Sequence, residues 1–128
     1  MTLTNIDKAH LKFAATLGYI DSDDFAHLKQ RWARYNEQEH EFGPEYLSLE
    51  AYLEMEKTSF MLFYVRNNSK SITDEEIIKY YNSNLDLFTR ADGDSFELPE
   101  LVEIIKKRIR EEEYLDNVKR ILLQYEKQ

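Results

Sequence analysis

Apolar side chains recur along this chain at intervals of three and four residues, which is the period of an amphipathic helix. No segment shows a confident alternation of apolar and polar positions, which is the pattern of a half-buried strand. The pattern predicts an all-α fold of about five helices with a long C-terminal helix, in a single domain of residues 1–128. The expected helices cover about residues 5–17, 23–35, 49–67, 74–84 and 99–125.

Residues with known roles at helix ends mark the first three boundaries. Gly18 suits the left-handed conformation that ends a helix. Asp21 or Ser22 could cap the helix that follows, since both side chains can accept a bond from a free backbone N–H. After the break "FGPEYLS", Ser48 is expected to cap the third helix.

The fourth helix has the clearest start signal in the chain. Thr73 and Glu76 have the spacing of a capping box, in which each side chain bonds the backbone N–H of the other residue. Ile72 stands just before the cap and can pack on Ile77 as a hydrophobic staple. A helix is therefore predicted from residue 74.

Two apolar segments guide the expected packing. The run "MLFYV", residues 61–65, is apolar on nearly all sides, so we expect it to be the most buried part of the domain. The last helix, with Pro99 at its start, is roughly 40 Å long at 1.5 Å per residue. A helix of that length either packs along several others or meets a partner.

Composition and charge exclude several classes of function. The formal net charge is −8 at pH 7, whereas general nucleic-acid binding needs clustered Lys and Arg. The chain has no cysteine, which excludes disulfides, thiolate metal sites and cysteine nucleophiles. No apolar run approaches the roughly 20 residues of a membrane span. The start, "MTLTNIDKAHLK", has no signal-peptide core, so either the protein is cytoplasmic or it is an exported protein without its leader.

We expect no metal site and no cofactor. The segment "EQEH" places Glu37 three residues before His40, but this is half of a di-iron carboxylate motif that needs a second copy. The segment "ADGDSFE" offers Asp92, Asp94 and Glu97, whose spacing does not fit an EF-hand loop. The histidines stand alone on separate segments: His10, His27 and His40.

Catalytic signatures are also missing from the sequence. It contains no nucleophile elbow and no glycine-rich phosphate loop. The basic run "KKRIR" at 106–110 is followed by "EEEY", an order typical of ion pairs on a helix surface.

Aromatic residues are the notable excess, at 13% of the chain. Tyrosine combines a large apolar ring with a polar tip, which suits both ordinary core packing and binding surfaces. Several aromatic side chains lining one groove would form a peptide-binding surface. The candidate contact residues are Trp32, Tyr35, Tyr52, Phe63, Tyr80, Tyr81 and Phe88.

A family resemblance enters at "ITDEEIIKYYNSNLDLF", residues 72–88, which resembles the helical chaperone part of SurA/PrsA-type peptidyl-prolyl isomerases. The segment "FELPELVEIIKKRIREEEY" is similar to the long helix that follows in that family, and "LGYIDSDDFAHLKQRWARYNEQ" and "FGPEYLSLEAYLE" also have counterparts there. The likeness covers about residues 11–114. It rests on scattered positions: Gly18, Phe25, Leu28, Asn36, Gly43, Pro44, Tyr52, Thr73, Glu76, Tyr81 and Phe88.

The chain departs from that family where the parvulin catalytic domain should follow Phe88. Only a short loop and the last helix remain there, and no histidine occurs after His40. The resemblance therefore implies a helical module without prolyl isomerase activity. Relatives also have helices before the segment that begins at Leu11, so a homodimer could close the surface left open at the first helix.

These observations lead to one expected function and two alternatives. We expect a non-enzymatic, chaperone-like module that holds unfolded or extended polypeptides in an aromatic-lined helical groove. Its acidic excess would favour basic or neutral segments over acidic ones. The first alternative is a structural or regulatory adaptor, or a homodimer, that acts through the long C-terminal helix. The second is an enzyme of unrecognised type, for which the sequence shows no convergent set of titratable groups.

Overall fold

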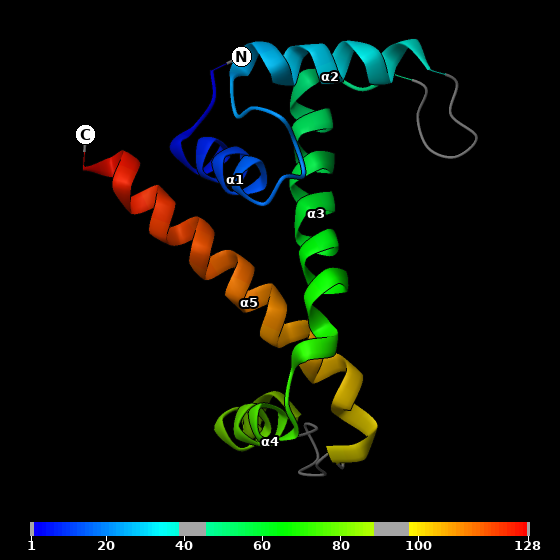
Figure 1. Ribbon diagram of the computed structural model, residues 1–128, viewed down its shortest axis with the longest axis vertical. Helices are drawn as coiled ribbons and strands as arrows, with labels where there is room; N and C mark the ends of the chain where they lie inside the picture. Colours follow the sequence, from blue (N-terminus) through cyan, green and yellow to red (C-terminus); the bar gives the residue numbers. More distant parts are fainter. Residues whose placement is uncertain (1, 39–45, 89–97, 128) are drawn as a thin grey trace. The chain divides into compact units, whose positions relative to one another are not determined.

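The structure is a computed structural model, and it describes residues 2–38, 46–88 and 98–127. Over these residues it contains five α-helices, two short 3-10 helices and no strand (Figure 1). The predicted all-α class with a long C-terminal helix is confirmed. In chain order the elements are α1 (Asn5–Thr16), α2 (Phe25–Glu37), α3 (Leu49–Asn68), η1 (Ser69–Ser71), α4 (Asp74–Ser83), η2 (Leu85–Phe88) and α5 (Leu98–Glu126).

The chain divides into two compact units. Unit 1 consists of Met1–Met61 and Leu115–Gln128, and unit 2 consists of Leu62–Tyr114. The helices α3 and α5 each continue from one unit into the other. Each unit is described by itself below, and the single domain expected from the sequence stays a prediction.

In unit 1, helix α1 has a complete capping box at its start. The Thr4 hydroxyl accepts a bond from the Asp7 backbone N–H, and the Asp7 carboxylate accepts one from the Thr4 N–H, both at 3.2 Å. Gly18 follows the helix with a φ of +81°, a conformation that glycine adopts without steric cost. The predicted glycine stop is therefore confirmed.

The predicted start of the second helix is wrong by a few residues. Helix α2 begins at Phe25, and Asp24 is the capping position, without a side-chain bond to the backbone. Ser22 instead accepts a bond from the Asp24 N–H at 3.1 Å, so its hydroxyl shapes the turn that precedes the helix. The Ser48 cap of α3 is confirmed, since its hydroxyl accepts a bond from the Ala51 N–H at 3.1 Å.

Unit 2 has a small core in which α4 lies beside the first turns of α5 (Figure 1). Thr73 caps α4 by accepting the Glu76 N–H at 3.2 Å, which confirms this bond of the predicted capping box. The two residues of the predicted staple, Ile72 and Ile77, belong to one buried cluster. That cluster consists of Ile72, Ile77, Phe88, Leu101 and Ile105.

The expectation that "MLFYV" is the most buried segment is wrong. Leu62 and Phe63 are 50% and 39% exposed, and only Tyr64 of this run is buried. Tyr64 packs on Tyr114 with ring centroids 5.9 Å apart. Within unit 2 the end of α3 therefore presents one face to a neighbour, although its sequence is apolar all round.

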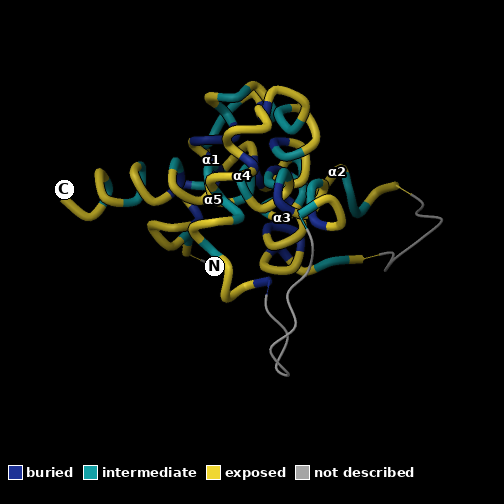
Figure 2. Tube along the Cα trace, turned by 90° about the horizontal axis from the view of Figure 1, so that it is seen from below, coloured by how far each residue is buried: buried dark blue, intermediate teal, exposed yellow. Residues whose placement is uncertain are grey.

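The last turns of α5 belong to unit 1 and bury little surface. Every residue from 119 to 127 is exposed or intermediate, and this end of the helix is yellow and teal at the C-terminal tip of the trace in Figure 2. At this end of the helix, Lys12 of α1 lies 5.7 Å from the Tyr125 ring centroid. Leu115, the first residue of this segment of α5 in unit 1, is half exposed.

Candidate functional site

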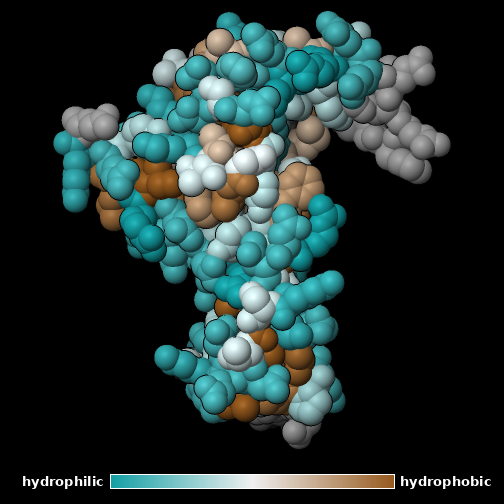
Figure 3. All heavy atoms as spheres, viewed as in Figure 1, coloured by the Kyte–Doolittle hydropathy of each residue, from teal (hydrophilic) through white to brown (hydrophobic). Residues whose placement is uncertain are grey.

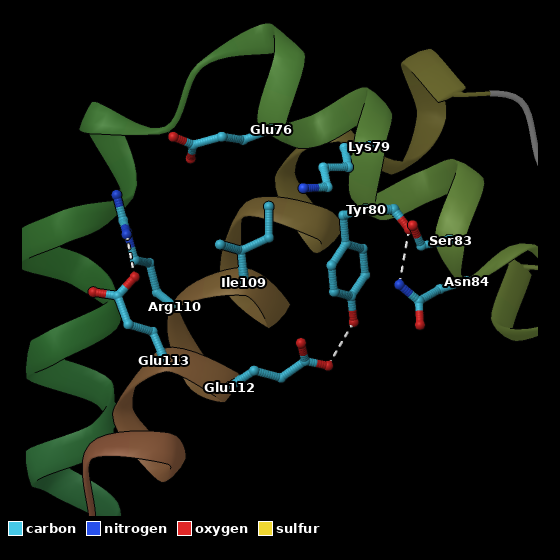
Figure 4. A pocket seen from close by; sticks show the side chains of 9 residues that line it. All are labelled: Glu76, Lys79, Tyr80, Ser83, Asn84, Ile109, Arg110, Glu112 and Glu113. Atoms are coloured by element: carbon cyan, nitrogen blue, oxygen red, sulfur yellow. Dashed lines mark hydrogen bonds and ion pairs between the residues drawn. The ribbon is translucent and has the colours of Figure 1, made fainter.

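A cleft with a volume of about 450 Å³ opens between α4 and α5 in unit 2 (Figure 4). Helix α4 provides positions 76, 79, 80 and 83, which share one helix face because they are three or four residues apart. Helix α5 provides the opposite wall. The lining residues are Glu76, Lys79, Tyr80, Ser83, Asn84, Ile109, Arg110, Glu112 and Glu113.

The apolar part of the cleft is formed by the Tyr80 ring and Ile109. Figure 4 shows these two side chains on the facing helices. Both are half-buried, because both pack against the core cluster of unit 2. The Tyr80 ring also contacts buried Phe88, with centroids 6.3 Å apart. This wall is therefore held in place by the core.

One charged pair in the cleft is held by internal contacts. The Arg110 guanidinium donates to the Asn68 carbonyl at 2.9 Å and to the Ser71 hydroxyl at 2.8 Å. It also pairs with Glu113, which accepts a second bond from the Tyr64 hydroxyl. The Arg110–Glu113 pair thus joins α5 to the end of α3 and to η1.

The other charged groups of the cleft stand at its open side. Glu76 and Lys79 extend from α4, and Glu112 extends from α5 (Figure 4). All three are exposed. The Tyr80 hydroxyl donates to Glu112 at 2.8 Å. Burial raises the pKa of Tyr80, and the bond to the Glu112 carboxylate raises it further, so the phenol stays protonated near neutral pH.

Exposed apolar side chains are frequent on unit 2. Figure 3 shows hydrophobic side chains gathered on its visible face, at the bottom of the picture. A contiguous apolar surface on a folded protein marks an interaction site more often than scattered single residues do. The large apolar residues of unit 2 that are exposed are Leu62, Phe63, Ile78, Leu85, Leu87 and Ile104.

Three of the candidate aromatic residues lie in unit 1. The Trp32 indole N–H donates to the Leu47 carbonyl at 2.7 Å. The Asn36 side-chain amide donates to the same carbonyl and accepts a bond from the Leu47 backbone N–H. Tyr35 packs on Tyr52 with ring centroids 5.5 Å apart. The indole N–H of Trp32 therefore fixes the backbone at Leu47, just before α3.

The other four candidates lie in unit 2. Tyr80 and Tyr81 are half-buried, and both rings pack on Phe88, which is 3% exposed. Phe63 is exposed on α3, with the Arg66 guanidinium 5.1 Å from its ring centroid. Of the seven aromatic residues proposed from the sequence, Tyr80 lines the cleft between α4 and α5. Tyr35 and Tyr52 line a separate hollow of about 260 Å³ in unit 1.

Sequence reasoning missed the polar residues of the cleft. The sequence places Glu76 in the helix cap, Ile109 on the apolar side of the last helix, and Glu112 on the surface of that helix. The spacing of 76, 80 and 83 on one side, and of 109, 112 and 113 on the other, was the available signal. It shows which residues share a helix face, but not that the two faces meet.

Unit 1 holds its central charges in internal pairs. Glu56 is buried and accepts two bonds from Arg31, at 2.8 and 3.0 Å, and a third from the Tyr52 hydroxyl at 2.9 Å. Burial raises the pKa of Tyr52, and the Glu56 carboxylate raises it further. This network joins α2 to α3.

A second internal pair joins α1 to α3. The Lys57 ammonium lies 2.8 Å from Asp7 and 2.6 Å from Glu54. Burial alone would raise the pKa of Asp7, but the bonds from Lys57 and Thr4 lower it below the usual 3.8. Burial and the nearby Lys57 charge lower the pKa of His10, so His10 is neutral at pH 7.

Two sequence expectations concern segments that the structure describes only in part. Within residues 2–38, 46–88 and 98–127, no group of three acidic or histidine side chains could hold a metal ion. His40 and the acidic residues Asp92, Asp94 and Glu97 lie outside these ranges. Among the described helices, none is both long and apolar enough to span a membrane.

The comparisons with known proteins show a likeness of fold. No family model matches the chain, and no curated protein matches it. The native crystal structure of a GH136 lacto-N-biosidase from Eubacterium ramulus is similar, with a TM-score of 0.75 and 24% identity. The match covers 93% of this chain and 27% of the hydrolase chain. For the selenomethionine form the TM-score is 0.73 and the identity 22%, over 94% and 28% of the two chains.

These findings correct the resemblance drawn from the sequence. The structural neighbours are parts of a glycoside hydrolase chain, and none is a SurA/PrsA-type prolyl isomerase. Among the described positions that carried that resemblance, Gly18 ends a helix, Thr73 caps one, and Tyr52 and Phe88 are buried aromatics, features that many helical proteins share. The chain spans about a quarter of the length of the hydrolase and shares the helical fold of that part.

Proposed function

We propose that this chain is a non-enzymatic binding module that holds unfolded or extended polypeptide segments on unit 2. The observation that supports this function best is the number of large apolar side chains that unit 2 exposes around its small core. A short polypeptide segment can cover such a surface with its own apolar side chains, and each area removed from water contributes to binding.

The preformed cleft of unit 2 is a second reason to place the binding region on this unit. The cleft between α4 and α5 offers the Tyr80 ring and Ile109, which are held by the core and need no ordering when a segment binds. Preformed contact surfaces lose less entropy on binding than flexible ones. Binding is expected to be weak and to tolerate many sequences, because its main contacts are apolar.

A titration of the isotope-labelled protein with an unfolded polypeptide containing Tyr and Pro tests this function. We expect fast-exchange chemical-shift changes on α4, η2 and the first turns of α5, with small changes on α1 and α2. The single tryptophan, Trp32, belongs to unit 1, so its fluorescence should change little. No shift in unit 2 at millimolar polypeptide overturns the proposal.

A matched pair of variants sharpens the test. Ile104 and Leu123 both lie on α5 and are 47% and 48% exposed, but Ile104 belongs to unit 2 and Leu123 to unit 1. Ile104→Ser should weaken binding about five-fold, because it removes about 1 kcal/mol of apolar burial in the complex. Leu123→Ser should leave the affinity unchanged. The reverse result would move the binding surface to unit 1.

The second candidate is a structural adaptor that docks on a folded partner. Its support is the likeness to about a quarter of a lacto-N-biosidase chain, in which the same fold belongs to a larger polypeptide. A folded glycoside hydrolase domain, or a second copy of this chain, would be the partner of the long helix α5. Light scattering over a hundred-fold concentration range tests the homodimer, and saturable binding to one folded domain distinguishes an adaptor from a general polypeptide binder.

A further inference from the structure

Unit 1 has two hollows that share a pair of arginines. Arg31 and Arg34 of α2 line both hollows, which have volumes of about 240 and 260 Å³. The smaller hollow also contains the Asp21 carboxylate, whereas no carboxylate of the described residues lines the larger one. We call the larger one the arginine hollow. Its lining residues are Arg31, Arg34, Tyr35, Gln38 and Tyr52.

Arg31 is held in place by a buried carboxylate. Its Nε and Nη2 groups donate to Glu56 at 2.8 and 3.0 Å, and Glu56 is 7% exposed. A guanidinium group has five N–H donors, so three remain on its other edges. The Arg31 side chain is 19% exposed, so these donors are not all covered. Because Glu56 fixes the group, donating to a ligand in the arginine hollow costs Arg31 little entropy.

Arg34 brings a charge that no direct partner in the described part of the chain offsets. It is exposed, and it forms no hydrogen bond or ion pair there. Glu56 offsets the charge of Arg31, so one positive charge is left at the arginine hollow. Asp21 in the smaller hollow and Glu37 on the exposed side of α2 weaken it only from a distance. One positive charge matches a carboxylate better than a phosphate monoester, which carries about −1.5 to −2.

Two tyrosine rings give the arginine hollow an apolar wall. Tyr35 and Tyr52 lie with their ring centroids 5.5 Å apart and their planes tilted by 53°. The Tyr52 hydroxyl donates to Glu56 at 2.9 Å, so Tyr52 offers a ligand its ring and not its polar tip. A large aromatic face favours contact with an apolar group. The lining therefore fits a carboxylate that is attached to an apolar body.

We propose that the arginine hollow binds a carboxylate group attached to an apolar body. An acidic side chain beside an apolar residue, or the C-terminus of a polypeptide that ends in an apolar residue, has this chemistry. The carboxylate would accept bonds from Arg34 and from the remaining N–H groups of Arg31, and the apolar body would contact the two tyrosine rings. The net charge of −8 opposes anions in general, so binding depends on these local contacts.

Chemical-shift titrations with four small probes test the site. N-acetylphenylalanine has both features, its amide lacks the charge, N-acetylglycine lacks the apolar ring, and phenyl phosphate replaces the carboxylate by a phosphate. Shifts should appear on residues 31–38 of α2 and on the first turn of α3. N-acetylphenylalanine should bind about five-fold more tightly than its amide, which is the range of an exposed ion pair. N-acetylglycine and phenyl phosphate should bind more weakly than N-acetylphenylalanine.

Two variants separate the arginine hollow from the overall charge. Arg34→Gln removes the guanidinium that has no described partner, and its exposed position makes loss of the fold unexpected. The control, Lys29→Gln, removes a positive charge from an exposed position of the same helix that lines neither hollow. Both variants change the net charge from −8 to −9. Arg34→Gln should reduce the preference for the carboxylate over the amide to less than about two-fold, and the control should retain most of it.

Two pairs of blocked dipeptides identify the source of the carboxylate. Acetyl-Phe-Glu-amide against acetyl-Phe-Gln-amide places the charge on an acidic side chain. Acetyl-Ala-Phe with a free C-terminus against its amide places the charge at the end of a chain. A preference for the charged member within the first pair assigns the site to acidic side chains, and one within the second pair assigns it to chain ends.

The outcomes separate this inference from the proposed function of unit 2. Equal binding of N-acetylphenylalanine and its amide, or tighter binding of phenyl phosphate, overturns the carboxylate site. Equal losses in Arg34→Gln and Lys29→Gln, or shifts confined to unit 2, overturn it as well. A carboxylate preference that is seen on α2 and lost only in Arg34→Gln supports it. None of these results depends on whether unit 2 binds polypeptides.

Discussion

In unit 1 the buried carboxylates are held by ion pairs inside the unit, whereas in unit 2 two carboxylates stand at the open side of a cleft. Glu56 receives three bonds from Arg31 and Tyr52, and Asp7 receives bonds from Lys57 and Thr4. Glu76 and Glu112 of unit 2 are exposed. The same residue types therefore stabilise the fold in one unit and remain accessible to a ligand in the other.

The apolar residues of the two units differ in the same way. The core of unit 1 includes the fully buried Leu11, Leu28 and Leu53. The core cluster of unit 2 has five buried residues. Among the described residues, six large apolar side chains are exposed in unit 2 and five in the longer unit 1, so unit 2 exposes more of them for its length. A unit with a small core and much exposed apolar surface gains stability when a partner covers that surface. Under the proposed function, unit 1 would be the scaffold and unit 2 would provide the binding surface.

The largest expected effect comes from removing the central aromatic residue of unit 2. Phe88 is buried and packs on Tyr80 and Tyr81, so Phe88→Ala should cost about 4 kcal/mol of the stability of this unit. Hydrogen exchange of the α4 amides should accelerate strongly. Leu87→Ala, at the exposed neighbour, should change the stability by less than about 0.5 kcal/mol. An equal loss of protection in α1 and α2 would show that the units unfold as one.

The second prediction concerns a variant that breaks the network of Glu56, Arg31 and Tyr52 in unit 1. Glu56→Ala leaves the Arg31 charge and the Tyr52 hydroxyl without their acceptor, so it should cost about 3 kcal/mol. Urea unfolding followed by Trp32 fluorescence measures this loss. Glu37→Gln, at an exposed position of the same unit, serves as the control and should stay within about 0.5 kcal/mol. A small effect at both positions would contradict a structural role for the network.

The third prediction concerns pH and the pair of Asp7 with Lys57. The pKa of Asp7 is below 3.8 in the folded chain, so its stabilisation is present above that pH and is lost as the pH falls through the folded pKa. The pKa of Lys57 is raised above 10.5. Burial would lower it, but the bonds that the ammonium donates to the Asp7 and Glu54 carboxylates outweigh burial. The share of stability from Lys57 is therefore present below pH 10.5 and is lost as the pH rises through its folded pKa.

Asp7→Asn should cost about 2 kcal/mol at pH 7. The difference between this variant and the original chain should close as the pH falls below about 3.8, where the original carboxylate also becomes neutral. Urea midpoints at pH 7, 5 and 3 provide the measurement. A difference that stays constant down to pH 3 would refute the ionic contribution of the pair.

The smallest expected effect compares the two threonine caps. Thr73 bonds one backbone N–H of α4, and Thr73→Ala should cost about 1 kcal/mol. The Thr4 side chain also lowers the pKa of Asp7, whose carboxylate pairs with Lys57. Thr4→Ala should therefore cost somewhat more, and it should raise the pKa of Asp7 toward its usual range. Carbon-detected NMR titration of the Asp7 carboxyl measures that shift, and equal costs without a shift would contradict the coupling.

Features decided by neighbouring residues were predictable from the sequence. The Thr73 cap, the pairing of Ile72 with Ile77, and the Gly18 stop depend on contacts within a few positions, so their spacing alone was sufficient. The predicted cap of α2 was wrong because a serine hydroxyl at position 22 could either cap a helix or form the turn before it, and in the structure it forms the turn. Both uses satisfy one backbone N–H, and local sequence does not distinguish them.

Features decided by contacts between distant segments were not predictable. The run "MLFYV" has no polar residue to show which side faces the core. In unit 2 the buried residue of this run is Tyr64, which packs on Tyr114, fifty positions away. The cleft was missed for the same reason, because Glu76 and Glu112 come together only when α4 packs on α5. The seven aromatic candidates were chosen by residue type, and the structure divides them between two units.

The sequence by itself determined that this protein is helical and where most of its helices begin and end, because the period of apolar residues and the capping groups act over one or two turns. Only the tertiary structure decided which carboxylates are held in internal pairs and which stand open, because that depends on the cations and hydroxyl groups that distant helices supply. Arg31 and Tyr52 reach Glu56 in this way, while Glu76 remains at an open cleft.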